Sequence, residues 1–220
     1  MKNIIFIAPP AAGNGTYAKL LAEKYNIPHI STGDLLREEV AKQNDLGLKI
    51  KDIIESGALV DDNIITSLLK NRLMMSDCNN GYILDGYPRN LEQAKAYENL
   101  LGSIDKKIGV VIFLDIDREL AMKRALSRII CSKCGTSYNL IDEQLKPKVE
   151  NICDRCNFDL KVRNDDNENT FINRFDTYIK KTQSLIDYYK NKNVLEVVRV
   201  MEHLSVSDVL NKIEEIINND

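Results

Sequence analysis

Four of the five cysteines are arranged in two Cys-x-x-Cys pairs, Cys131 with Cys134 and Cys153 with Cys156, and 18 residues separate the two pairs. This spacing is typical of sites in which four thiolates surround one zinc ion tetrahedrally. Four protein ligands leave no position open for water, so the sequence predicts a structural zinc and not a catalytic one. Two disulfides are the alternative, which a reducing compartment disfavours. Cys78 stands alone and is expected to bind no metal.

A segment of small residues is the second feature with chemical potential. Residues 8–16, Ala-Pro-Pro-Ala-Ala-Gly-Asn-Gly-Thr, follow an apolar run at 3–8 and precede a helical pattern at 17–24. At such a position, backbone N–H groups and a helix N-terminus can bind phosphate. A standard phosphate loop also carries a lysine, but neutral Asn14 stands at that position. From the loop alone, a phosphate site and a purely structural turn are both open. Lys19, about one helical turn onward, is expected to point away.

The order of hydrophobic patterns indicates which elements position these residues. Short β-rich runs alternate with helical patterns, which indicates a parallel sheet with helices on both faces. The expected strands lie at 3–8, 27–30, 82–85, 108–115 and 194–198, and the expected helices at 17–24, 61–74, 91–101, 117–129, 169–190 and 205–217. Two stretches do not fit the alternation, at 31–60 and 127–164, and are interpreted as inserted lobes.

Two further motifs carry a resemblance to a known family. They are Ser-Thr-Gly-Asp-Leu-Leu-Arg at 31–37 and Asp-Gly-Tyr-Pro-Arg at 85–89, the latter followed by Gln93. Because both motifs occur in this order, the chain resembles adenylate kinases over nearly its whole length. It resembles in particular the bacterial type with a long zinc-binding lid. The resemblance implies an α/β fold like that of P-loop nucleoside monophosphate kinases, with a five-stranded parallel sheet. It implies a core of residues 1–30, 61–126 and 165–220, an AMP-binding lobe at 31–60 and a lid at 127–164.

The same resemblance implies reversible phosphoryl transfer from Mg-ATP to AMP, giving two ADP. The AMP side would comprise Thr32, Arg37, Ala58, Leu59, Val60, Gly86, Arg89, Gln93, Arg163 and Arg174. The ATP side would comprise Ala11, Ala12, Gly13, Asn14, Gly15, Thr16, Arg124, Arg128, Ser137, Tyr138 and Val200. Tyr138 is equally compatible with packing inside the lid. The catalytic residues would be Arg89, Arg128, Arg163 and Arg174, with Asp85 orienting hydrated Mg2+.

Arginine suits the assigned roles. Arg124 and Arg128 lie four residues apart on one helical pattern and so project to the same side. Phosphoryl transfer requires positive charge around the moving group, and guanidinium groups bind phosphate oxygens through two parallel hydrogen bonds. Singly, such arginines are more often solvated surface residues. The five in family register are instead predicted to form a ring of cations, namely Arg37, Arg89, Arg128, Arg163 and Arg174.

Several positions depart from the family pattern. The loop has Ala8, Ala11 and Asn14 where the family has two glycines and a lysine. Residues 197–200, Val-Val-Arg-Val, replace a turn that normally surrounds the ATP adenine, which weakens the assignment of Val200. A second hypothesis follows from Asn14, namely a catalytically impaired protein that binds or senses adenine nucleotides.

Composition excludes other classes of function. The net charge of −3 and the absence of tryptophan argue against a zinc-ribbon nucleic-acid binder, and no apolar segment reaches the roughly 18 residues of a membrane span. The apolar run at the N-terminus is too short for a secretory signal. We therefore expect a cytoplasmic monomer whose partners are ATP, AMP and ADP, with no nucleic acid and no membrane among them.

Overall fold

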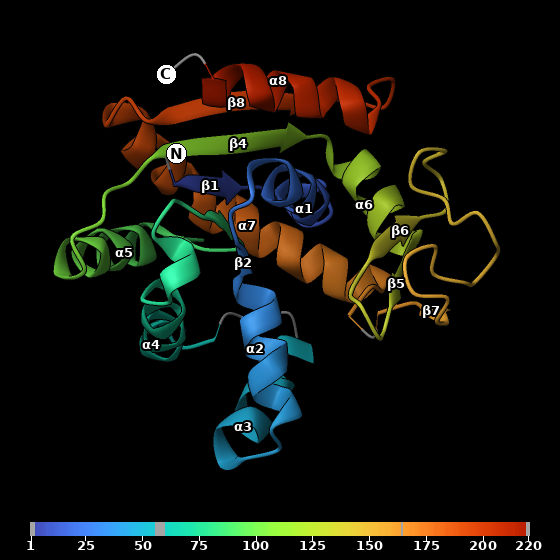
Figure 1. Ribbon diagram of the computed structural model, residues 1–220, viewed down its shortest axis with the longest axis horizontal. Helices are drawn as coiled ribbons and strands as arrows, with labels where there is room; N and C mark the ends of the chain where they lie inside the picture. Colours follow the sequence, from blue (N-terminus) through green and yellow to red (C-terminus); the bar gives the residue numbers. More distant parts are fainter. Residues whose placement is uncertain (1–2, 56–59, 164, 219–220) are drawn as a thin grey trace.

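The central feature of the chain is a five-stranded parallel sheet, seen in a computed structural model that describes residues 3–55, 60–163 and 165–218 (Figure 1). Its strands are ordered β2-β3-β1-β4-β8. They are β1 (Ile4–Ile7), β2 (His29–Ser31), β3 (Ile83–Asp85), β4 (Val110–Ile116) and β8 (Leu195–Val200). Ile4 of β1 lies opposite Ile83 on one side and Val110 on the other. The predicted fold class is confirmed.

Helices cover both faces of this sheet because β1 is apolar on both sides. Ile4 and Phe6 pack with α1, α6 and α8, whereas Ile5 and Ile7 face the opposite cluster with α4 and α5. The long helix α7 contributes to both clusters. The helices of the core are α1 (Asn14–Tyr25), α4 (Asp62–Leu73), α5 (Leu91–Ser103), α6 (Arg118–Leu126), α7 (Glu168–Asn191) and α8 (Val206–Asn218), with a 3-10 turn at Ser76–Cys78.

Side-chain caps determine where several helices begin. Ser31 accepts a hydrogen bond from the N–H of Asp34 at the start of α2, and Asn90 accepts one from Gln93 at the start of α5. Asp117 caps α6 in the same way. Such caps satisfy the free N–H groups of the first helical turn and typically contribute about 1 kcal/mol each. They fix the elements that follow the ends of β2, β3 and β4.

Two lobes extend from the core (Figure 1). The first consists of α2 (Thr32–Ala41) and α3 (Asp45–Glu55), which pack on each other. The second is a small antiparallel sheet, ordered β6-β5-β7, of β5 (Arg128–Cys131), β6 (Ser137–Asn139) and β7 (Leu160–Lys161).

One expected helix is shorter than predicted. The pattern at 117–129 predicts a helix through Ile129, but α6 ends at Leu126 and Ile129 lies in β5, paired with Tyr138. Ile129 is 5% exposed inside the small sheet. Burial in the second lobe therefore overrides the helical pattern, which cannot distinguish a buried helix position from a strand position.

None of the helices in the described part of the chain is both long enough and apolar enough to cross a membrane.

Candidate active site and metal centre

A large cleft lies where the core meets the two lobes. Its volume is about 1280 Å³, and its walls come from the loop after β1, the end of β3, α2, α7 and the β5–β6 sheet. Ligands of open α/β sheets bind outside the carboxyl ends of the strands, which is where this cleft is. The fold thus gathers segments distant in sequence around one space.

The loop after β1 leads into a helix N-terminus that has no side-chain cap. Gly13 precedes α1 with φ of 102°, and a Cβ at that position would meet the ring of Tyr17 at 2.9 Å. Ala11 also has a positive φ, 61°. Uncapped N–H groups at the start of a helix attract anions, because no side chain satisfies them and the helix dipole is positive there. This geometry favours phosphate binding over a purely structural turn.

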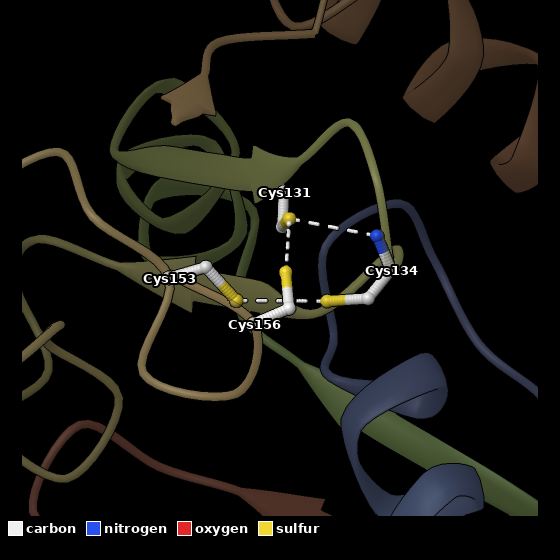
Figure 2. A group of neighbouring side chains, drawn as sticks. All are labelled: Cys131, Cys134, Cys153 and Cys156. Carbon is white, nitrogen blue, oxygen red and sulfur yellow. Dashed lines mark hydrogen bonds between the residues drawn. The ribbon is translucent and has the colours of Figure 1, made fainter. Parts of the chain in front are cut away.

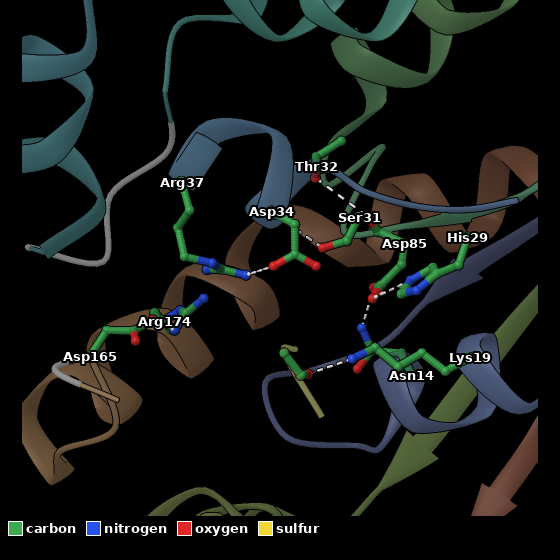
Figure 3. A network of polar contacts seen from close by, with 11 residues as sticks. Asn14, Lys19, His29, Ser31, Thr32, Asp34, Arg37, Asp85, Asp165 and Arg174 are labelled. Carbon is green, nitrogen blue, oxygen red and sulfur yellow. Dashed lines mark hydrogen bonds and ion pairs between the residues drawn. The ribbon is translucent and has the colours of Figure 1, made fainter. Parts of the chain in front are cut away.

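Asn14 does not stand free in the loop (Figure 3). Its side-chain amide donates a hydrogen bond to Oδ1 of Asp85, at the end of β3. Oδ2 of the same carboxylate lies 3.4 Å from Nε2 of His29. Asp85 is 6% exposed, so the carboxylate is a nearly buried acceptor at the floor of the cleft. The position expected to hold a cation is therefore neutral and turned toward an acid.

Lys19 enters the cleft, which contradicts the expectation that it points away. Its side chain is half-buried and its ammonium donates a hydrogen bond to the carbonyl oxygen of Gly135 in the second lobe. Figure 3 shows the side chain extending from α1 to the hydrogen bond that its ammonium makes. Helical spacing gave the wrong direction because a helical side chain leans toward the N-terminus and covers the turn before it.

Three of the arginines assigned to the nucleotide sites are paired with aspartates. Arg37 lies 2.5 Å from Asp34 within α2, and Arg174 on α7 lies 2.8 Å from Asp165. Arg128 binds Asp166 with two nitrogens, its Nε at 2.7 Å from Oδ2. The three pairs are Arg37 with Asp34, Arg128 with Asp166, and Arg174 with Asp165. Each aspartate accepts hydrogen bonds from its charged guanidinium group, and a phosphate could replace the aspartate as the acceptor.

Arg89 and Arg163, which were also assigned to the site, have no carboxylate at ion-pair distance among the described residues. Arg89 donates from Nε to the carbonyl of Gly86 at 2.7 Å, and Nε of Arg163 is buried without any hydrogen-bond partner. Burial and the neighbouring Arg174 lower the pKa of Arg89 to about 10. Burial, with Arg128 close by, lowers the pKa of Arg163 to about 10. Both side chains stay cationic at neutral pH and are poorly compensated, as expected of groups that bind an anion.

The four paired cysteines converge in the second lobe (Figure 2). Their sulfur atoms all lie within 4.8 Å of one another, with Cys131 and Cys156 3.4 Å apart and Cys134 and Cys153 3.5 Å apart. A disulfide has a sulfur separation of about 2.05 Å, whereas tetrahedral Zn–S bonds of about 2.3 Å place sulfurs roughly 3.8 Å apart. The cluster therefore fits a four-thiolate metal site and does not form disulfides.

Tyr138 packs against this cluster. Its hydroxyl donates to Sγ of Cys153 at 3.5 Å and accepts from the N–H of Asp154 at 2.8 Å. The side chain is 6% exposed. Packing inside the second lobe therefore accounts for both hydrogen bonds of the Tyr138 hydroxyl. The residue also lines the cleft, where ATP contact was the other expectation.

Comparison with known proteins agrees with this geometry. The sequence profile described as adenylate kinase matches residues 6–194. The chain is 49% identical to an adenylate kinase of Fervidobacterium nodosum over 193 aligned residues, and the aligned region covers 88% of each chain. It is 44% identical to adenylate kinases of Thermosipho africanus, covering 98% of each chain, and of Thermotoga neapolitana, covering 99% of this chain and 97% of the relative. The chain belongs to the adenylate kinase family. It is thus a nucleoside monophosphate kinase with the P-loop kinase fold.

The residues expected on the AMP side of an adenylate kinase come together around a smaller cavity beside the main cleft. They are Thr32, Arg37, Val60, Gly86, Arg89, Gln93 and Arg174. Gln93 is fully buried there, its oxygen accepting from the N–H of Arg89 at 2.7 Å and its nitrogen donating to Asp62 at 2.6 Å. Arg163 lines the main cleft. Ala58 and Leu59 lie outside the described residues.

The residues expected on the ATP side of the adenylate kinase cleft are only partly gathered there. The cleft is lined by Ala11, Gly13, Asn14, Gly15, Thr16, Arg124, Arg128, Ser137 and Tyr138. Ala12 and Val200 are buried in the core instead, at 0% and 2% exposure. Val206, at the start of α8, lines the cleft although the sequence did not single it out.

Sequence reasoning also missed the aspartates that pair with the cleft arginines. Asp34 is part of the motif at 31–37, and Asp165 and Asp166 follow Arg163 closely, so acidic residues near each arginine were visible. The pairing of Asp166 with Arg128 and of Asp165 with Arg174 was not visible in the sequence, because it depends on how α7 returns beside the second lobe.

Proposed function

We propose that the protein catalyses reversible transfer of the γ-phosphoryl group of Mg-ATP to AMP, giving two ADP. One observation carries the proposal: the cleft at the uncapped N-terminus of α1 and the small cavity beside it, which Thr32 and Gln93 line, share Arg89 and Arg174 in their walls. Two nucleotides bound at these places would have their phosphates facing each other. This arrangement serves direct transfer and needs no protein nucleophile.

Arginines would position the phosphates. Arg89 and Arg174, which line both cavities, bind the AMP phosphate, while Arg128 and Arg163 bind the moving group. Binding exchanges a carboxylate for a phosphate at Arg128 and Arg174, and supplies a first anionic partner to Arg89 and Arg163. Closure of both lobes then excludes water, which prevents hydrolysis of ATP.

Asp85 fits the role of orienting Mg2+. Its carboxylate is nearly buried at the end of β3 and lies beside the loop that would hold the phosphates. Bound Mg2+ would neutralise charge on the phosphate oxygens. The amide of Asn14 donates to this carboxylate and holds it toward the loop, and Nε2 of His29 lies 3.4 Å from its other oxygen.

The cysteine cluster would hold one structural zinc. The lobe around it has a buried core of five residues, Ile129, Cys131, Tyr138, Cys153 and Leu160, which is too small to stabilise a domain alone. We further propose that residues 31–60 and 127–164 move as lobes on a core of 1–30, 61–126 and 165–220. Unoxidised Cys-x-x-Cys thiols suit a reducing, cytoplasmic location, and we propose a monomer that binds no nucleic acid.

A second function is favoured by Asn14. A loop without a cation, whose amide is engaged by Asp85, is expected to bind ATP and yet support transfer poorly. On this reading the protein binds or senses adenine nucleotides and turns over slowly.

An assay of ADP formation from ATP, AMP and Mg2+ separates the two functions. The proposed function predicts ADP in both the forward and the reverse direction, and an at least ~100-fold lower kcat for Arg174→Gln. Arg118→Gln is the matched control, because Arg118 pairs with Asp176 at 3.1 Å and does not line the cleft. Binding of both nucleotides without turnover would favour the sensing function.

A further inference from the structure

The missing charge at Asn14 leaves a requirement that the cleft must meet in another way. Transfer of a phosphoryl group concentrates negative charge on oxygens next to the loop, and a neutral amide provides no counter-charge. The amide of Asn14 is also occupied by Asp85. Any replacement must therefore be a cation that faces the cleft from the loop side.

Lys19 meets these conditions. It lies on α1, the helix whose N-terminus follows the loop, and its half-buried side chain lines the cleft. Within the described part of the chain, no carboxylate lies at ion-pair distance from its ammonium, which contacts the neutral carbonyl of Gly135. Lys24, one and a half turns further on the same helix, is exposed and is paired with Glu214 at 2.7 Å.

The distance from Lys19 to the loop is within reach of its side chain. Five residues along a helix span about 7.5 Å, and a helical side chain leans toward the N-terminus. Lys19 and Asn14 line the same cleft. The contact with Gly135 is one that a phosphate would displace, because an ammonium binds an anionic oxygen more strongly than a neutral carbonyl.

Resting on the proposed function, we propose that Lys19 supplies the cation that the phosphate loop lacks, by moving from the Gly135 carbonyl to the terminal phosphates of ATP. The loop keeps its backbone donors, and the positive charge comes from the next turn of α1. Gly135 has a positive φ of 67°, and a Cβ there would lie 3.8 Å from the ammonium, so the lid backbone approaches Lys19 closely. The same lysine thereby links ATP binding to the position of the lid.

A purely mechanical role for Lys19 is the rival interpretation. The hydrogen bond to Gly135 joins the core to the second lobe, so its loss alone could disturb lid closure. The two interpretations differ in what a lysine at position 14 would do. A restored loop lysine makes the charge of Lys19 redundant but leaves the contact with the lid unchanged.

A double-mutant cycle of Lys19→Gln and Asn14→Lys tests the proposal, with Lys24→Gln as the control on the same helix. We expect Lys19→Gln to lower kcat about 100-fold in the unmodified protein, and less than about 3-fold when Asn14→Lys is present. Lys24→Gln is expected to change kcat in neither background. Thermal unfolding of each variant checks that the fold is retained.

ATP affinity, measured by calorimetry without AMP, gives a second readout that does not require turnover. We expect Lys19→Gln to weaken ATP binding about 10-fold and to leave AMP binding unchanged. Equal losses of kcat in both backgrounds would show a mechanical role and overturn the proposal, as would unchanged kcat and ATP affinity. An unmodified protein that makes no ADP would refute the proposed function alone, and ATP affinity would then decide the role of Lys19.

Discussion

Arg163 illustrates a residue that lowers the stability of the fold and that we propose binds a ligand. Its guanidinium is largely buried, its Nε has no partner among the described residues, and its pKa lies at about 10. Arg163 is a cation at neutral pH, and because its pKa is lower in the folded protein than the ordinary value of an arginine, folding with this charge costs stability. Arg174 differs, since Asp165 compensates it at 2.8 Å.

Replacing these two arginines by methionine should therefore change stability in opposite directions. Arg163→Met removes a poorly compensated buried cation and should raise the free energy of unfolding at pH 7 by about 1 kcal/mol. Arg174→Met leaves Asp165 unpaired and should lower it by about 1–3 kcal/mol. Both should reduce kcat by at least ~100-fold. Denaturant unfolding without nucleotide measures the difference, and a loss of stability in Arg163→Met would contradict this account.

Ala11 is a second residue that lowers the stability of the fold, in this case through its backbone conformation. Its φ of 61° is left-handed, where a Cβ is disfavoured by about 1–2 kcal/mol. Glycine relieves this strain, but it also increases the conformational entropy of the unfolded chain, which costs about 0.4–1 kcal/mol of stability. On balance, Ala11→Gly should stabilise the protein by about 0.5–1 kcal/mol. Ala12→Gly is the control, since Ala12 is fully buried and has no positive φ, and it should destabilise the protein. Equal effects of the two changes on Tm would show that Ala11 is unstrained.

The sequence predicted residue types at the site better than their partners. The cysteine spacing predicted a four-thiolate cluster, because four ligands at such spacing have few other uses. The direction of Lys19 and the pairing of Arg128 with Asp166 were not predictable in this way. They depend on where the second lobe sits relative to α1 and α7, which no local pattern specifies.

Among elements, the second lobe is expected to depend on a bound metal. Its five-residue core includes two of the cysteines, and the sheet β6-β5-β7 has only short strands. We expect one zinc per chain in protein purified without added metal. Chelation should remove hydrogen-exchange protection from residues 128–161 and leave the five-stranded sheet protected, because that sheet has its own core. Absence of any thiophilic metal, or equal protection with and without chelator, would refute the prediction.

The elements themselves were largely predictable because buried parallel strands are continuous apolar runs. The run at 3–8 became β1, and the turn after it became the phosphate loop. The pattern failed at 117–129, where helix and strand meet without a glycine or proline between them. Ser127 follows the last residue of α6, its hydroxyl bonded to the carbonyl of Lys123, and its type does not signal a helix end.

For the whole molecule, the structure of the smaller cavity predicts selectivity for AMP. Gln93 is held on both sides of its amide, by Arg89 and Asp62, so its orientation is fixed before a base arrives. A fixed polar edge rejects bases with a different pattern of donors and acceptors. We expect kcat/KM for AMP to exceed that for CMP and GMP by at least ~100-fold. Comparable turnover of the three in a coupled ADP assay would place the chain among less selective kinases.

The aspartates beside Arg37, Arg128 and Arg174 have a consequence for ionic strength. They cancel part of the cleft's positive charge, so the field that an approaching nucleotide meets is weaker than the arginines alone would produce. Salt screens this long-range field, with a Debye length of about 10 Å at 0.1 M, far more than it screens contacts inside the closed cleft. KM for ATP should therefore rise only modestly between 0.05 and 0.5 M KCl, and more steeply in Asp165→Asn. Nucleotide capture by this protein would then tolerate large changes in the salt content of its surroundings.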